Sequence, residues 1–196
     1  MTGPAHRVER YFDTLSRLTA AVEATDGAGA GMPLGAAIDR ILTLLRDASA
    51  AGGRMMFVGN GGSAAIASHM AIDFTKNGGM PALAFNDGAA LTCLANDLGY
   101  ENAFAHQVTA HGRPGDILVA ISSSGQSANI LKAADAARAK GLLLLTLSGF
   151  EAGNPLRAMC EVNLYVPSSQ YGFVEITHLA LCHAVLDIAT NWNGRH

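Results

Sequence analysis

The chain has 196 residues, and 13 Lys and Arg against 16 Asp and Glu give it a formal net charge of −3. Apolar residues make up 49% of the chain and charged residues only 15%, which excludes a disordered protein. This charge balance offers no basic surface for nucleic acid, and the longest aliphatic run, Leu142 to Leu145, is far too short to cross a membrane.

Two amphipathic helices are predicted in residues 1–52. Apolar residues recur at helical spacing up to about Thr25, which predicts a helix that ends there. The sequence DGAGAG at 26–31 predicts a flexible break, and a second helix should begin near Pro33. The apolar faces of both helices need a partner, which is either the protein's own sheet or another subunit. We interpret this segment as an oligomerisation element.

Residues 53–196 alternate strands with helices. The strands are continuous apolar runs, which is typical of strands buried on both faces of a parallel sheet. Their expected ranges are 55–58, 81–85, 116–121, 142–147 and 162–166, and helices are expected at 64–76, in a stretch ending near 96–97, before Lys140, and at 172–190. The chain 1–196 is therefore predicted to be a single α/β domain, a three-layer αβα sandwich with a central five-stranded parallel sheet, preceded by the two N-terminal helices.

The cysteines indicate a reducing compartment. Cys93, Cys160 and Cys182 are odd in number and lack the spacing of metal ligands, so we expect buried reduced thiols. Near the N-terminus, Arg7 and Arg10 stand where a signal peptide would have its apolar core. The sequence therefore predicts a cytoplasmic protein with no nucleic acid and no membrane as partners.

A glycine-rich loop follows the first strand of the sheet. Residues Gly59 to Ser63 place backbone N–H groups and a hydroxyl at a helix N-terminus, which is a ready site for an anion. Gly59, Gly61 and Ala64 also fit the G-x-G-x-x-A pattern of dinucleotide-binding loops, with Asp87 as a candidate ribose ligand. A tight turn capped by a serine explains the same residues, so this loop alone does not decide among the three.

A serine-rich loop follows the third strand, and it favours phosphate. Four hydroxyls surround the start of the next helix, more than capping requires, and Gly125 lets the backbone approach a ligand closely. Neither loop contains Lys or Arg, so dipoles and hydroxyls would hold the anion. Because both loops follow strands of a parallel sheet, they should lie at the same edge. The four hydroxyls belong to Ser122, Ser123, Ser124 and Ser127.

Histidines and carboxylates on two helices are candidates for a polar site. His69 and Asp73 are four residues apart and share a helix face, which is also the spacing of an ordinary surface hydrogen bond. On the last helix, Glu175 and His183 are about two turns apart. Several titratable groups on an apolar helix suggest a polar site against it, whereas we interpret His178 as a core histidine. The other histidines form no constellation: His6, His106, His111 and His196.

The loops and their flanks resemble the sugar isomerase (SIS) domain family and, within it, the bacterial phosphoheptose isomerases. The resemblance rests on GNGGS at 59–63, LANDLGY at 94–100 and ISSSGQSANILKA at 121–133, and it covers nearly the whole chain. It implies an aldose–ketose isomerase that converts sedoheptulose 7-phosphate to D-glycero-D-manno-heptose 7-phosphate through a cis-enediol. It also implies a homotetramer, in which the N-terminal helices pack between subunits and the active sites lie near the interfaces.

The resemblance further implies a divalent metal, in the first place zinc. Members of the family bind zinc through a His and a Glu on the first helix after the glycine loop and a Gln and a His on the last helix. The matching positions here are His69, Asp73, Glu175 and His183, and all four side chains can ligate zinc, manganese or iron(II). The family Glu is also the general base. Because Asp73 is one methylene shorter, Glu175 could take that role, and Gly172 stands where the family has a further Asp.

The resemblance also implies which residues act on the substrate. Asp73 or Glu175 would be the base, His183 the acid or a metal ligand, and His69 a ligand. The remaining substrate-binding residues would be Asn60, Gly61 and Gly62 on the sugar hydroxyls, the pair Asn96 and Asp97, and Ser63, Ser122, Ser123, Ser124 and Ser127 on the phosphate, together with Glu175.

Three other functions stay open. The two carboxylate changes could adapt an SIS isomerase or epimerase to another phosphosugar. The family also contains a non-enzymatic tetramer that binds a replication initiator protein, although four competent ligand residues favour an enzyme here. A dinucleotide-dependent oxidoreductase would explain the first loop but not the four serines of the second.

Overall fold

The five predicted strands form the parallel part of a larger sheet. In the computed structural model, which describes residues 4–191, seven strands run in the order β2-β1-β7-β6-β5-β3-β4. The strands β3 and β5 are buried along their whole length, as their continuous apolar runs predict. Residues 1–3 and 192–196, with His196, lie outside the described part of the chain. The parallel strands are β3 (Met55–Gly59), β4 (Ala82–Ala84), β5 (Ile117–Ser122), β6 (Leu143–Ser148) and β7 (Val162–Tyr165).

Two short antiparallel strands extend the predicted five-stranded sheet at one edge. β1 (Glu23–Thr25) pairs with β7, and β2 (Gly31–Met32) pairs with β1. The prediction of a helix up to Thr25 is therefore wrong. The first helix, α1 (Pro4–Ala20), ends five residues earlier, at Ala20. The tertiary context overrides the helical spacing because these residues pair with the open edge of β7 and bury Ala24.

The DGAGAG segment is a hydrogen-bonded hairpin turn, so the prediction of a flexible break is also wrong. The carboxylate of Asp26 accepts hydrogen bonds from the N–H groups of Ala28 and Ala30, each at 2.9 Å. Asp26 also donates its own N–H to the carbonyl of Ala30. An Asp side chain that bonds to the backbone two residues on is a common way to fix a turn.

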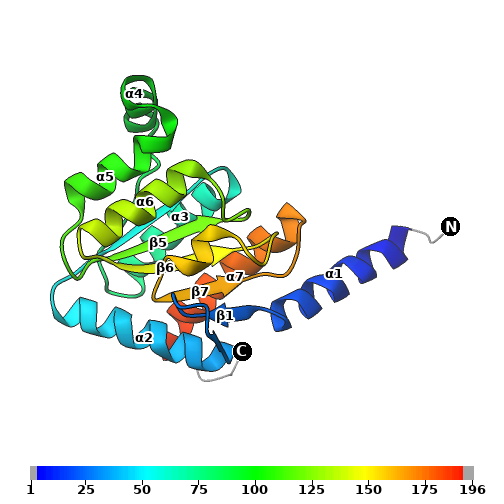
Figure 1. Cartoon of the computed structure of the whole chain (residues 1–196). Helices are drawn as coiled ribbons and strands as arrows, with labels where there is room; N and C mark the ends of the chain where they lie inside the picture. The colour runs from blue at the N-terminus through cyan, green and yellow to red at the C-terminus, as the bar shows by residue number, and fades with distance from the viewer. Residues whose placement is uncertain (1–3, 192–196) are drawn as a thin grey trace.

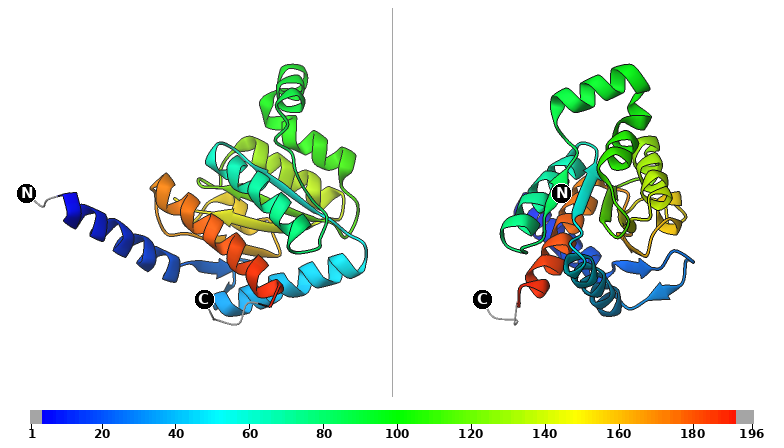
Figure 2. Two further views of the ribbon diagram at one scale, coloured as in Figure 1. Left: turned by 180° about the vertical axis from the view of Figure 1, so that it is seen from behind. Right: turned by 90° about the vertical axis from the view of Figure 1, so that its left-hand side faces the viewer.

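Helices cover both faces of the sheet, which confirms the three-layer αβα sandwich (Figures 1 and 2). Successive strand residues point to opposite faces: Met55 and Phe57 join one apolar core, whereas Met56 and Val58 join the other. The first layer consists of α2 (Leu34–Ala50), α3 (Gly62–Lys76) and α7 (Tyr171–Ala189), and the second of α5 (Ala103–His111) and α6 (Ala128–Ala139). The helix α5 is not predicted from the sequence, because it is short and its buried side includes the polar Gln107.

The strand order places a crevice between β3 and β5. The chain passes from β3 outward to β4 and then returns to form β5 on the other side of β3. The ends of β3 and β5 are therefore the topological switch point, where open α/β sheets bind their ligands. The register pairs Gly59 with Ile121, so the glycine loop and the serine loop begin side by side at this edge.

Two helices project from the body of the molecule (Figure 1). Neither α1 nor α4 (Gly88–Leu98), both inside the described range, has a buried residue. On α1, the side chains of Val8 and Phe12 are 56% and 61% exposed. By contrast, the apolar stripe of α2 packs on the protein's own sheet. A short 3-10 segment, η1 (Tyr100–Asn102), joins α4 to α5.

The last helix, α7, packs against the sheet and carries a buried histidine. By length and composition α7 could span a membrane, but 44% of its most apolar window is buried inside the fold, as in a core helix. His178 is fully buried, and its Nε2 donates to the carbonyl oxygen of Ser148 at 3.0 Å, so the interpretation as a core histidine is confirmed. Its Nδ1 has no hydrogen-bond partner among the described residues. Burial lowers the pKa of His178 to about 4.

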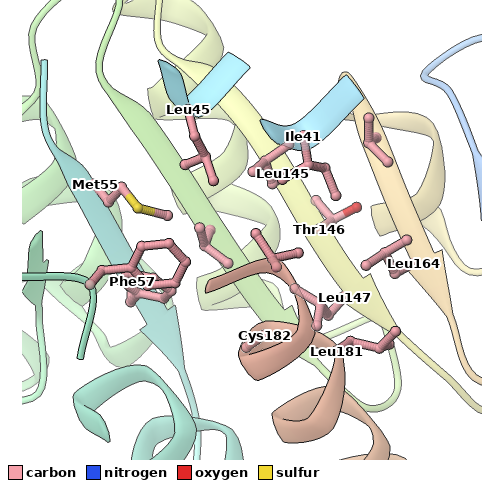
Figure 3. Close-up of a pocket in the computed structure, with 14 residues that line it drawn as sticks. Ile41, Leu45, Met55, Phe57, Leu145, Thr146, Leu147, Leu164, Leu181 and Cys182 are labelled. Carbon is pink, nitrogen blue, oxygen red and sulfur yellow. The ribbon is translucent and has the colours of Figure 1, made fainter. Parts of the chain in front are cut away.

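The apolar core between the sheet and α2, α3 and α7 retains a small void (Figure 3). Its volume is about 30 Å³, and apolar side chains such as Leu45, Phe57 and Leu181 line it. A void of this size without convergent polar groups stays dry. This void is therefore a feature of core packing, and the functional site has to be sought at the polar edge of the sheet.

The buried His178 makes stability depend on pH. In the unfolded chain the imidazole takes up a proton below its ordinary pKa of 6.5, whereas the folded protein resists protonation until about pH 4. We therefore predict that the free energy of unfolding falls by about 3 kcal/mol between pH 7 and pH 4 from this group alone. Urea unfolding at a series of pH values measures the slope of the free energy of unfolding against pH. His178→Gln should flatten it, and His106→Gln, at an exposed position on α5, should not; equal slopes in all three proteins would contradict the prediction.

Candidate active site

The serine loop lines a pocket of about 110 Å³ at the switch point. The glycine loop, the serine loop and the first two turns of α7 all contribute to it. Among the described residues, no Lys or Arg lines the pocket, as the sequence predicts. The lining residues are Asn60, Ser63, Ile121, Ser122, Ser123, Ser124, Ser127, Tyr171 and Glu175.

The serine hydroxyls of this loop differ in their hydrogen bonds. The hydroxyl of Ser122 accepts the N–H of Gly125 at 3.1 Å and lies 3.3 Å from the hydroxyl of Ser127. Gly125 has a φ of +63°, which glycine adopts without strain. Ser127 stands at the N-cap of α6 without capping it, and the buried hydroxyl of Ser123 has no partner among the described residues. Hydroxyls left over from the loop's own hydrogen bonds are the donors that a phosphate needs.

The carboxylate of Glu175 lies against the first turn of α3. A Cβ atom added at Gly62 would overlap both carboxylate oxygens of Glu175, so this contact requires glycine. Gly62 begins α3, where the free N–H groups of the helix carry partial positive charge. The carboxylate of Glu175 therefore occupies the space beside the N-terminus of α3, where an anionic ligand would otherwise bind. The glycine loop contributes Asn60 and Ser63 to the lining of the pocket.

Three of the four predicted metal ligands come together on α3 and α7. His69 Nε2 is 3.3 Å from His183 Nε2 and 3.4 Å from Asp73 Oδ2. One ligand atom from each of these three residues lies within 4.8 Å of the others. Glu175 is not part of this group, because its carboxylate lies at Gly62, two turns before His183 on α7.

The donor set fits a divalent metal. Two ligands at 2.0–2.1 Å from a tetrahedral zinc lie about 3.3 Å apart, which is the spacing of the two imidazole nitrogens here. Two imidazoles and one carboxylate are also a common catalytic set, because they leave a coordination position for substrate. His69, Asp73 and His183 would therefore hold the metal.

The structure does not bring Asn96 and Asp97 to the serine pocket. Both are exposed on the projecting helix α4, neither lines the pocket, and the amide of Asn96 donates to the carboxylate of Asp97 at 2.8 Å. Asp87, the candidate ribose ligand, caps α4 instead, since its carboxylate accepts the N–H of Ala90 at 2.8 Å. This use of Asp87 removes one of the supports for a dinucleotide site.

Comparison with known proteins identifies the family. Residues 10–149 match the family model described as SIS domain. The chain belongs to the SIS domain family. Its relatives include the phosphoheptose isomerase of Rhodospirillum rubrum, 43% identical over 139 residues, which cover 68% of this chain and 73% of the relative. The phosphoheptose isomerase of Serratia proteamaculans is 40% identical over 158 residues, which cover 78% of this chain and 81% of the relative.

Solved structures of the SIS family confirm the fold over nearly the whole chain. The phosphoheptose isomerase of Neisseria gonorrhoeae superposes with a TM-score of 0.83 at 32% identity, covering 95% of this chain and 98% of that one. The enzyme of Francisella tularensis gives a TM-score of 0.82 at 29% identity, covering 96% and 98%. The resemblance drawn from the two loops is thus confirmed at the level of family and fold.

Some residues of this SIS site escape sequence reasoning. Tyr171 lines the pocket from the first turn of α7, and Asn129 and Tyr100 hydrogen-bond to Asn60. Asn129 and Tyr100 lie inside the two stretches that carry the family resemblance, but nothing in their spacing connects them to Asn60, which is 69 and 40 residues away. Only the pairing of β3 with β5 brings Asn129 close.

The contact between Gly62 and Glu175 predicts a specific non-additivity. Gly62→Ala should lower the free energy of unfolding by about 0.5–1 kcal/mol, because the new methyl group displaces the half-buried end of the flexible Glu175 side chain. In a Glu175→Ala background, where the space is free, the same change should cost less than about 0.5 kcal/mol. Chemical denaturation of the four proteins measures both values. Gly35→Ala, at a helical glycine with open space around it, is the matched control, and additive effects of the two changes would contradict the contact.

The His69–Asp73–His183 group predicts stabilisation by zinc. At a Zn²⁺ concentration of 100 times the Kd, binding to the folded state should raise Tm by about 5–10 °C. His183→Ala should abolish the shift because it removes one of three ligands, whereas His106→Ala should leave it intact. Differential scanning calorimetry with and without Zn²⁺ measures the shift in Tm. A shift that persists in His183→Ala would show that the metal binds elsewhere.

Proposed function

We propose that the chain is an aldose–ketose isomerase that converts sedoheptulose 7-phosphate to D-glycero-D-manno-heptose 7-phosphate. One observation carries the proposal: α3 and α7 each reach both the serine pocket and the histidine group. On α3, Ser63 lines the pocket and His69 lies six residues on, about 9 Å along the axis. On α7, Glu175 and His183 are separated by about 12 Å in the same way. A sugar phosphate can therefore be held at one end and react at the other.

The phosphate would bind to the serine loop. The hydroxyls of Ser123 and Ser127 and the N-terminus of α6 would donate to its oxygens without a cationic side chain. Because the phosphate is remote from the reacting carbons, its binding energy fixes the position of the other end of the sugar. A pocket that holds the phosphate alone suits several phosphosugars, and the relatives named phosphoheptose isomerase favour the heptose.

Glu175 would act as the base. Its carboxylate lines the serine pocket beside the first residue of α3, and it makes no hydrogen bond with another of the described side chains, so it is available to take a proton from C1 of the ketose. Glu175 would return the proton to C2 of the resulting cis-enediol to give the aldose, while a hydroxyl proton passes from the C1 oxygen to the C2 oxygen. Asp73 would orient His69 and complete the ligand set. A bound metal would supply Lewis-acid stabilisation of the charge on these oxygens.

The proposal includes a homotetramer in the cytoplasm. The apolar side of α1 is exposed in the single chain, and α1 touches the body where Tyr11 packs on Phe173 of α7, with ring centroids 4.6 Å apart. A second copy of the chain would cover the remaining face, which includes Val8 and Phe12. All three cysteines are free thiols, which suits a reducing compartment. Cys160 and Cys182 are buried as predicted, whereas the prediction is wrong for Cys93, which is exposed on α4.

The reaction can be followed by NMR in deuterated water. Zinc-loaded protein should produce aldose from sedoheptulose 7-phosphate, with deuterium entering next to the carbonyl. Glu175→Gln should lower kcat at least about a hundredfold, because a carboxamide cannot accept the proton. Asp73→Asn should act mainly through metal affinity, so saturating zinc should restore part of its activity. Full activity of Glu175→Gln would contradict the assigned base. Turnover of a different phosphosugar alone would move the proposal to another SIS isomerase, and a zinc-loaded protein without any turnover would favour the non-catalytic binding function.

A further inference from the structure

Two other side chains hold the amide of Asn60 on one side. Asn60 follows β3 and lines the serine pocket. Its Nδ2 donates to Asn129 Oδ1 at 2.9 Å, and its Oδ1 accepts from Asn129 Nδ2 at 2.8 Å. The hydroxyl of Tyr100 donates to the same Oδ1 at 2.7 Å. The two amides therefore form a reciprocal pair, with Tyr100 as a third member.

This arrangement leaves Asn60 with hydrogen-bond donor capacity only. An amide oxygen has two lone pairs and an amide nitrogen has two N–H groups. Both lone pairs of Asn60 Oδ1 are occupied by Asn129 and Tyr100, whereas one N–H of its Nδ2 has no partner among the described residues. A ligand in the pocket thus meets a group that donates a hydrogen bond and cannot accept one. Such a group selects oxygens that accept a hydrogen bond, and it binds most strongly to those that carry or develop negative charge.

The three residues come from three different elements. Asn129 is only 3% exposed and lies in the first turn of α6, directly after the serine loop. Tyr100 begins η1, at the foot of the projecting helix α4. A buried amide that loses its partner costs free energy, so the pair resists separation. The network therefore ties the glycine loop to the serine loop and fixes the distance between their ligand-binding groups.

We propose that Asn129 and Tyr100 are positioning residues, which hold Asn60 as a one-sided hydrogen-bond donor toward the phosphosugar. Neither residue lines the pocket, so both act through Asn60. The nature of the ligand rests on the proposed function, whereas the orientation of the amide rests on the three hydrogen bonds alone.

A double-mutant cycle tests whether Asn129 acts through Asn60. Asn60→Ala and Asn129→Ala should each lower kcat/KM by about tenfold, the value of one hydrogen bond to the ligand. The double variant should be no worse than Asn60→Ala, because Asn129 has no second route to the substrate. Losses that multiply to about a hundredfold would overturn the proposal, as would full activity of Asn129→Ala. Asn77→Ala, at the exposed C-cap of α3, is the matched control.

A second measurement does not depend on activity. With ¹⁵N-labelled asparagine, the side-chain NH₂ signal of Asn60 is identified by its loss in Asn60→Ala. In Tyr100→Phe, which should fold because Tyr100 is 51% exposed and loses only its hydroxyl, this signal should shift and its protons should exchange faster with water. An unchanged signal would overturn the proposal. A wild-type protein that turns over no phosphosugar but shows these NMR changes would contradict the proposed function and leave the orientation of Asn60 established.

Discussion

Because β4 lies on the outer side of β3, the chain must return past β3 to form β5, and this return decides where a site can form. The loops that follow β3 and β5 begin side by side at the polar edge of the sheet. The helices α3 and α7, which pack on one face of the same sheet, then reach both the serine pocket and the group of His69, Asp73 and His183. The pocket, the candidate metal ligands and the position of Glu175 all depend on this single strand pairing.

Among the residues that the structure describes, no cationic side chain lines the serine pocket. The N-terminus of α3 faces the carboxylate of Glu175, and the N-terminus of α6, with its serines, would receive the phosphate of the proposed substrate. Two negative groups can thus occupy neighbouring positions because each has its own helix N-terminus. The side chain of Asn60, held by Asn129 and Tyr100, adds a neutral hydrogen-bond donor between the two loops. The carboxylate of Glu175 lies where the proposed chemistry needs a base, and Gly62 is the residue that makes room for it.

The sequence predicts the elements whose signal is local. Continuous apolar runs predict all five parallel strands, and the serine surplus predicts the pocket. The antiparallel edge is missed because Glu23–Thr25 becomes a strand only when β7 offers an open edge. Of the four predicted metal ligands, Glu175 lies apart from the other three, because helical spacing cannot show that its carboxylate lies against Gly62. Asn129 is missed because its partner is 69 residues away. Local chemistry is therefore visible in the sequence, whereas contacts set by the sheet are not.

The central claim is that the serine pocket and the histidine group are the two ends of one substrate site. A crystal structure of the Glu175→Gln variant with zinc and sedoheptulose 7-phosphate tests it most directly. Anomalous scattering locates the metal, and the density of the phosphate locates the other end of the sugar. The account predicts zinc at His69, Asp73 and His183, phosphate within hydrogen-bond distance of Ser123 and Ser127, and the carbonyl carbon beside residue 175. Phosphate bound away from the serine loop, or zinc bound away from these three ligands, would contradict it.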